Sequence, residues 1–162
     1  GDLGFPVWRT MGGVMGMCIC NDRRWPETYR MMGLQGVEMI MLGYNTPATE
    51  PPWGFEPTHL AGLHNNLSMQ AGAYQNATWV IGVAKAGNEG GCDMMGGTLI
   101  VAPTGEIVAQ GRTLEDELVI ADCDLDACNH YKNTVFNFAE HRQPDQYGLI
   151  TETAGVILPP DD

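Results

Sequence analysis

The sequence predicts an α/β fold in which helices pack on a mixed β-sheet. Two features predict it. Apolar strand-like segments alternate with helical segments in the first half of the chain, and two strand-like segments joined by a tight turn follow. With 162 residues, 44% of them hydrophobic, the chain is long enough for one domain with a substantial core.

The first half of the chain begins with two predicted strands, residues 5–10 and 14–20, which the turn "MGG" joins. Pro26 fits the first turn of a helix, and Gly36 fits the position just after its end. The apolar run "VEMIML", residues 37–42, then predicts a third strand.

The segment 43–57 is rich in proline and glycine and is expected to be a loop. A long helix is predicted from Thr58, and the segment 78–84, "TWVIGVA", reads as the next strand. The apolar face of that helix is expected to consist of five residues: Leu60, Leu63, Leu67, Ala71 and Tyr74.

The second half opens with two predicted strands in the stretch "GTLIVAPTGEIVAQ", on either side of a turn at residues 103–105. A further strand is expected over residues 117–125, and a short helix over 126–135. From residue 136 to residue 162 we expect a C-terminal tail of low regularity, because it carries few periodic signals.

The charge and the cysteine content limit the possible functions. The formal net charge is −12, which opposes binding to nucleic acid and to anionic membranes. No apolar run is long enough to span a membrane. The five cysteines are odd in number and match no disulfide scaffold, so we expect a cytoplasmic location.

The stretch "MCICNDRRWPE" places Cys20 at the carboxyl end of a predicted strand, shortly before a helix begins at Pro26. Ligands of α/β sheets bind at this edge, and a helix N-terminus and nearby arginines favour a thiolate. Arg23 and Arg24 also fit a substrate that carries a carboxylate. The alternative is a buried strand whose cysteines serve as small apolar residues.

The motif "CNDRRWPE" resembles the nucleophile motif of the nitrilase superfamily of carbon–nitrogen hydrolases. Within this superfamily the resemblance is to the N-carbamoyl-D-amino-acid hydrolases, and it extends over nearly the whole chain. The segments that carry it include "GYNTP", "LSMQAGAYQN", "VAPTGEIVA", "TLEDE" and "FNFAEHRQPDQYGLI".

This resemblance implies an αββα four-layer sandwich with mixed sheets, no metal or organic cofactor, and a homo-oligomer (dimer or tetramer). It implies hydrolysis of an N-carbamoyl-D-amino acid, a small substrate with a carboxylate, to the D-amino acid, carbon dioxide and ammonia. Cys20 matches the family's nucleophile, Arg23, Arg24 and Thr46 its carboxylate ligands, and Asn21 and Asn45 the residues near the reacting centre. The six implied site residues are Cys20, Asn21, Arg23, Arg24, Asn45 and Thr46.

The sequence departs from the family at one point. The family uses a Glu–Lys–Cys triad in that order along the chain, yet the 19 residues before Cys20 contain neither Glu nor Lys. Lys85 and Lys132 come later, where the family has no catalytic lysine. We therefore expect residues 1–162 to form the C-terminal portion of a single carbon–nitrogen hydrolase domain.

Other interpretations stay open at this stage. The chain fits another superfamily member, such as a β-ureidopropionase or an aliphatic amidase, or a binding module that has lost the triad. His59 or His64 fits a papain-like Cys–His pair, although a core histidine is the simpler reading of His64. The Cys18–Cys20 pair has no second pair at ligand spacing, so no metal site is expected.

Overall fold

The computed structural model describes residues 2–48 and 57–160 of the chain. Six strands form one sheet in the order β1-β2-β3-β4-β7-β8, and β5 and β6 form a small separate hairpin. The strands are β1 (Val7–Thr10), β2 (Gly13–Ile19), β3 (Met39–Tyr44), β4 (Trp79–Ala84), β5 (Asn88–Glu89), β6 (Cys92–Asp93), β7 (Leu99–Val101) and β8 (Ile107–Gln110). The helices are η1 (Cys20–Arg24), α1 (Pro26–Gly33), α2 (Thr58–Asn76), α3 (Ala127–Lys132), α4 (Phe138–His141), η2 (Pro144–Gln146) and α5 (Gly148–Glu152).

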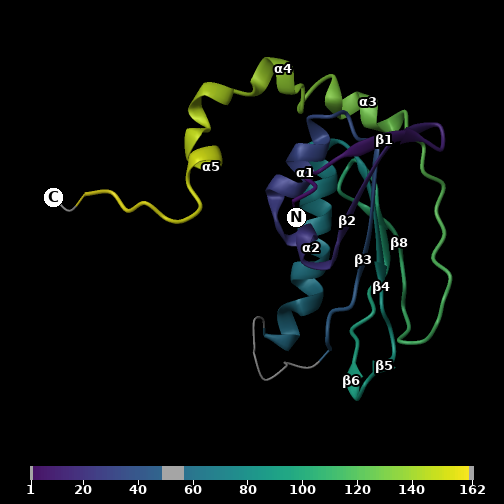
Figure 1. Cartoon of the computed structure of the whole chain (residues 1–162). Coiled ribbons are helices and arrows are strands. Elements are labelled where there is room, and N and C mark those ends of the chain that lie inside the picture. Colours follow the sequence, from purple (N-terminus) through teal and green to yellow (C-terminus); the bar gives the residue numbers. More distant parts are fainter. Residues whose placement is uncertain (1, 49–56, 161–162) are drawn as a thin grey trace.

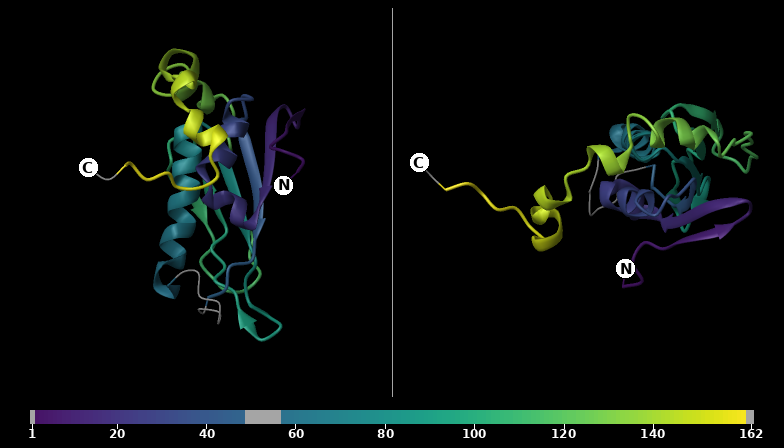
Figure 2. Two further views of the ribbon diagram at one scale, coloured as in Figure 1. Left: turned by 60° about the vertical axis from the view of Figure 1, so that its left-hand side comes forward. Right: turned by 90° about the horizontal axis from the view of Figure 1, so that it is seen from above.

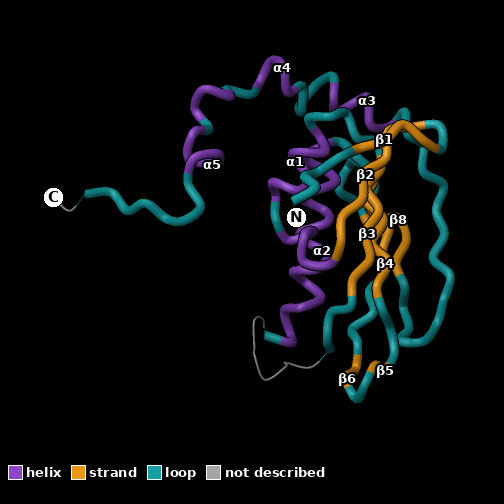
Figure 3. Tube along the Cα trace, in the orientation of Figure 1, coloured by secondary structure: helices purple, strands orange, loops and turns teal. Residues whose placement is uncertain are grey.

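The sheet is mixed, as predicted. Strands β2, β3 and β4 are parallel, whereas β1, β7 and β8 join the sheet through antiparallel pairs. Helix α1 connects β2 to β3, and α2 lies on the same side of the sheet, so the two helices form one layer over it (Figures 1 and 3). The carboxyl ends of β2, β3 and β4 therefore lie at one edge.

The main core lies between this helix layer and the sheet. Strand β3 alternates, with Ile40, Leu42 and Tyr44 buried against the helices. Helix α2 supplies Met69 and Ala73 to the same cluster, and both are fully buried. Full burial of a large apolar side chain such as Ile40, Leu42 or Met69 contributes roughly 1.5–3 kcal/mol to the stability of the fold.

The other face of the sheet is only partly covered. Near one end, Trp79, Ile100 and Cys128 form a second buried cluster, against which the extended segment 119–125 packs. Further along, Met17, Ile19 and Val83 are 62%, 69% and 57% exposed. The sheet thus has one face filled by helices and one face with an open apolar area.

The predicted strand 117–125 is wrong, because no strand occurs between β8 and α3. The segment is extended, and its alternate residues Val119, Ala121 and Cys123 do pack on the second cluster. It is anchored there by the Trp79 indole, which donates a hydrogen bond to the Asp124 carbonyl (2.8 Å). The alternation reflects packing of side chains against a sheet face without backbone pairing to another strand.

The predicted apolar face of α2 is also wrong. Leu63 and Leu67 are 58% and 57% exposed, whereas Ala61, Asn65 and Met69 face the sheet and are buried. The close approach of α2 to α1 leaves no room for a Cβ atom at position 72, where the Tyr29 ring packs. The predicted loop 43–57 lies in part outside the described residues.

The predicted tail consists of short helices α4, η2 and α5 joined by irregular chain, and it leads away from the sheet and helix layers (Figures 1 and 2). It is attached near its start, where the Arg30 guanidinium of α1 lies over the Phe138 ring (4.3 Å to the ring centroid). Beyond that point Leu149, Val156 and Leu158 are largely exposed.

Two glycines of α2 give a matched test of this packing. A Cβ atom at position 72 would lie 2.6 Å from ring carbons of Tyr29, whereas one at position 62 would meet nothing within 4 Å. We expect Gly72→Ala to lower the free energy of unfolding by roughly 1–3 kcal/mol. Gly62→Ala should raise it by about 0.5–1 kcal/mol, because Ala favours a helix. Urea unfolding followed by circular dichroism measures both, and equal effects would contradict the close α1–α2 contact.

Candidate active site

The site is built around the end of β2. Strand β2 ends at Ile19, and Cys20 begins the 3₁₀ turn η1 with a φ of 48°, in the left-handed region that non-glycine residues rarely adopt. Such a conformation costs of the order of 1–3 kcal/mol; Met11, in a turn, and Ala77, at the end of α2, share it, and Cys20 differs from them in lying at the carboxyl end of a parallel strand. A sharp strand-to-helix turn of this kind exposes a nucleophile at the edge of a sheet.

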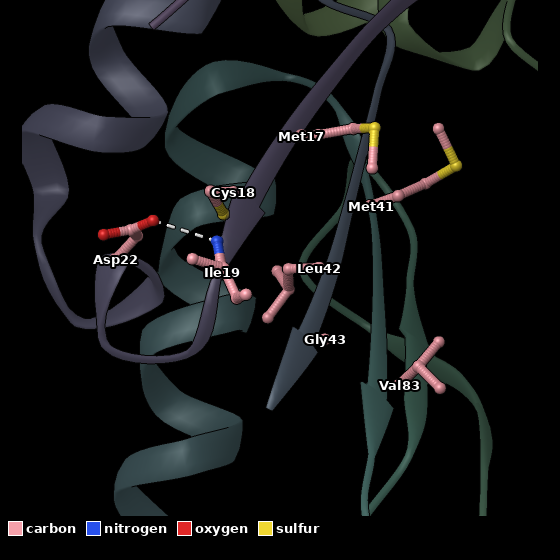
Figure 4. Close-up of a pocket in the computed structure, with 8 residues that line it drawn as sticks. All are labelled: Met17, Cys18, Ile19, Asp22, Met41, Leu42, Gly43 and Val83. Atoms are coloured by element: carbon pink, nitrogen blue, oxygen red, sulfur yellow. Dashed lines mark hydrogen bonds between the residues drawn. The ribbon is translucent and has the colours of Figure 1, made fainter. Parts of the chain in front are cut away.

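The turn is held on both sides of Cys20. The backbone N–H of Ile19 donates to the Asp22 carboxylate (2.9 Å), as Figure 4 shows. From the other side, the Arg23 guanidinium donates to the Cys20 carbonyl (2.7 Å). Both contacts span three residues, so they fix the direction in which the Cys20 side chain leaves the strand.

The next strand brings a polar side chain to the cysteine. Because β2 and β3 are parallel, Asn45, which directly follows β3, lies at the same edge as Cys20. The Cys20 Sγ lies 3.9 Å from Asn45 Oδ1. An amide orients a thiol or a substrate group, but it cannot take up the thiol proton.

Arg23 and Arg24 differ in burial, although both line one pocket. Arg23 is only 1% exposed and donates to the Thr46 hydroxyl (2.8 Å) and to the Asn65 amide oxygen (3.1 Å). Arg24 lines a pocket between η1, α1 and α2, with Tyr29 among the other residues there. That both arginines bind one carboxylate stays a prediction, and their different burial favours different roles for the two.

The other residues singled out in the sequence differ in burial and in their contacts. Asn21 is exposed on η1, next to Cys20, and Thr46 is half-buried where it accepts the bond from Arg23. His59 is exposed near the start of α2, and His64 is half-buried. Lys132 of α3, which was not expected to be catalytic, donates to the Val37 carbonyl (2.7 Å) and so serves the packing of α3.

Cys18 is not equivalent to Cys20. It packs against the main core, and burial, followed by the negative charge of Asp22, raises the pKa of its thiol to about 12. At neutral pH the Cys18 thiol is therefore uncharged and a poor nucleophile. This agrees with the expectation that Cys18 has a packing role.

Sequence reasoning missed two residues of the site. Tyr44 lies under the Arg23 guanidinium (4.2 Å to the ring centroid), and Asn65 accepts a bond from Arg23 Nε (3.1 Å). Both are buried. The sequence carried no signal for Asn65, because the predicted apolar face of the helix did not include it.

An apolar pocket opens beside the site, on the uncovered face of the sheet (Figure 4). Met17 and Ile19 of β2 line it together with Met41 of β3 and Val83 of β4. Its polar group is Asp22, whose carboxylate is already bonded to the Ile19 N–H. The pocket therefore has the character of an apolar packing surface next to the nucleophile turn.

Within residues 2–48 and 57–160, no group of three or more His, Cys, Asp or Glu side chains is placed to hold a metal ion. Across the same part of the chain, no helix combines the length and the apolar character that crossing a membrane requires.

Comparison with known proteins gives a consistent result. The family profile described as carbon–nitrogen hydrolase matches residues 1–133. The chain is 30% identical to an N-carbamoylputrescine amidase of Arabidopsis thaliana, over 97% of the chain and 54% of that protein. It is 32% identical to a formamidase of Bradyrhizobium sp., over 75% of the chain and 34% of that protein.

The fold also matches solved structures. A carbon–nitrogen hydrolase from Helicobacter pylori G27 superposes with a TM-score of 0.81 at 23% identity, over 94% of this chain and 54% of that one. The chain thus spans about half the length of the relatives it matches most extensively.

Proposed function

The chain belongs to the carbon–nitrogen hydrolase family, and from this premise we propose that it supplies the cysteine nucleophile of an N-carbamoyl-D-amino-acid hydrolase. The observation that carries the proposal is the conformation of Cys20, held in a left-handed turn at a strand end with Asn45 at its sulfur. Such strained placement costs stability, which is understandable where a side chain must reach a substrate.

The proposed reaction has two steps. The Cys20 thiolate attacks the carbamoyl carbon, an S–C bond forms, and the terminal C–N bond breaks as ammonia leaves with an added proton. Water then cleaves the acyl-enzyme, and the released carbamate loses carbon dioxide to give the D-amino acid. Asn45 and Asn21 are proposed to hold polar parts of the substrate beside the sulfur.

This chemistry needs a general base at two points, to deprotonate the thiol and to activate the water. Asn45 cannot fill that role. We therefore propose that residues 1–162 act with an upstream portion that contributes the glutamate and the lysine of the triad. The open apolar face of the sheet, with Met17, Ile19 and Val83 exposed, supports this proposal, since a second sheet would bury it.

A second candidate is a hydrolase of N-carbamoyl amines. It is favoured by the three similar plant N-carbamoylputrescine amidases, which are 30–31% identical over 96–97% of this chain. The carbamoyl group is common to both candidates, and the charge on the rest of the substrate differs. A direct comparison of N-carbamoyl-D-phenylglycine with N-carbamoylputrescine, measured as ammonia release by the chain with its upstream portion, tests the choice.

Arg24 provides a mutational test of the carboxylate. If its guanidinium binds the substrate carboxylate, Arg24→Ala should lower kcat/KM by about 10- to 100-fold, the size of one charge-assisted hydrogen bond. The loss should nearly vanish for the analogue in which an uncharged amide replaces the carboxylate. An equal loss for both substrates would instead assign Arg24 to the packing of α1 against α2, in agreement with the pocket that it lines.

A further inference from the structure

Arg23 is a buried cation directly beneath the nucleophile turn. Its side chain is 1% exposed, and each of its three guanidinium nitrogens donates a hydrogen bond. Nη1 donates to the Cys20 carbonyl (2.7 Å), Nη2 to the Thr46 hydroxyl (2.8 Å) and Nε to the Asn65 amide oxygen (3.1 Å). These acceptors belong to three different segments: η1, the segment after β3, and α2.

The guanidinium is also fixed from its flat side. It lies over the Tyr44 ring, 4.2 Å from the centroid, which is a favourable cation–π geometry. The Tyr44 hydroxyl donates to the Gly97 carbonyl (2.7 Å) and accepts a bond from the Asn65 amide (3.2 Å). The planar fork of Arg23 is thus held in one orientation by a network that a lysine could not reproduce.

All of these partners are neutral groups, and each is a fixed part of the protein. A residue that recognises a substrate carboxylate needs donors directed at the place where the substrate binds. Arg23 instead directs three of its five N–H groups at protein acceptors, one from each nitrogen, and its side chain is 1% exposed. The bond to the Cys20 carbonyl is the one with a chemical consequence, because it holds the residue whose φ of 48° is strained.

We propose that Arg23 is a positioning residue, which keeps Cys20 in its left-handed turn and so presents the sulfur at the sheet edge. This inference rests on the proposed role of Cys20 as nucleophile. It assigns Arg23 a role different from carboxylate recognition. Without the fork, Cys20 relaxes toward an ordinary backbone conformation, and its sulfur leaves the position beside Asn45.

The test uses two alkylating reagents that differ in one carboxylate. In each case the Cys20 thiolate displaces iodide, from neutral iodoacetamide or from anionic iodoacetate. Rates at each cysteine of the 162-residue chain are followed by mass spectrometry with fragment-level assignment. Cys92, on the β5–β6 hairpin, serves as reference thiol, and Arg9→Gln, at an exposed position of β1, controls for the lost charge.

We expect Arg23→Gln to lower the rates of both reagents at Cys20 by the same factor, about tenfold, which corresponds to losing one charge-assisted hydrogen bond. Arg23→Lys should be equally slow, because it restores the charge without the fork. Arg9→Gln should leave both rates at the wild-type value. A fall for iodoacetate alone, or no change at all, would overturn the proposal.

A local effect at Cys20 has to be distinguished from global unfolding of the variant. Cys128 is fully buried and reports global unfolding through its own labelling. If Arg23→Gln exposes Cys128, Thr46→Val supplies the test, since it removes a single acceptor of the fork, and it should again slow both reagents at Cys20 equally. Alkylation needs no turnover, so a failure of the proposed hydrolase activity leaves this outcome intact.

Discussion

Replacing Cys20 by serine is expected to lower turnover of the carbamoyl substrate by about a thousandfold or more, because a serine hydroxyl lacks the nucleophilicity of a thiolate. The measurement is ammonia release by the chain combined with its upstream portion. The substitution changes one atom at the end of β2, so the left-handed turn and its bonds to Asp22 and Arg23 are retained. Any loss therefore belongs to the chemistry of the sulfur.

Cys18→Ser is the matched control, two residues earlier in the chain, on β2. It should cost roughly 1–2 kcal/mol of stability, since a hydroxyl is placed where an apolar thiol packs against the core. Turnover by the folded Cys18→Ser protein should stay near that of the wild type. Full activity of the Cys20→Ser protein would rule out Cys20 as the nucleophile.

The position of Cys20 could be predicted because it depends on local signals. An apolar strand, a short turn and a proline at the start of a helix determine where the strand ends, and parallel neighbours then bring the segment after β3 to the same edge. The mixed sheet followed from the order of the elements in the same way. Neither inference required knowledge of which side chains meet in space.

The two incorrect predictions concern features that tertiary contacts determine. Leu63 and Leu67 have the spacing of an apolar helix face, yet α2 turns Asn65 and Met69 toward the sheet. Its close packing on Tyr29 leaves no room for a Cβ atom at position 72. The segment 117–125 has the alternating apolar and polar residues of a strand. Its apolar side chains pack on a face of the sheet, but its backbone does not pair with another strand.

The proposed positioning role of Arg23 could not be predicted from the sequence for a related reason. Its three acceptors come from residues 20, 46 and 65, and only the fold brings them together. In the sequence, two adjacent arginines beside a nucleophile indicate a site for an anion. In the structure Arg23 is buried and bonded to neutral acceptors, whereas Arg24 is half-buried, and both line a pocket between α1 and α2.

The second large effect concerns the chain by itself. Purified alone, the 162-residue chain is expected to show turnover of N-carbamoyl-D-phenylglycine at the background rate. Cys20 then lacks a base to accept its proton, and the oxyanion has backbone donors without a lysine. Removing several members of one catalytic unit costs about as much as removing the most important one, so little residual activity should remain.

Adding the proposed upstream portion as a separate polypeptide should restore turnover. It should also cover the apolar face formed by Met17, Ile19 and Val83, which is expected to make the isolated chain prone to association. Circular dichroism tests whether the isolated chain is folded, and light scattering follows its association. Ammonia release measures the activity before and after mixing. The Cys20→Ala chain, mixed in the same way, is the control that must stay inactive. If the wild-type chain alone turns over the substrate and Cys20→Ala abolishes that activity, a base lies within these 162 residues, and His59 and His64 become the first residues to replace.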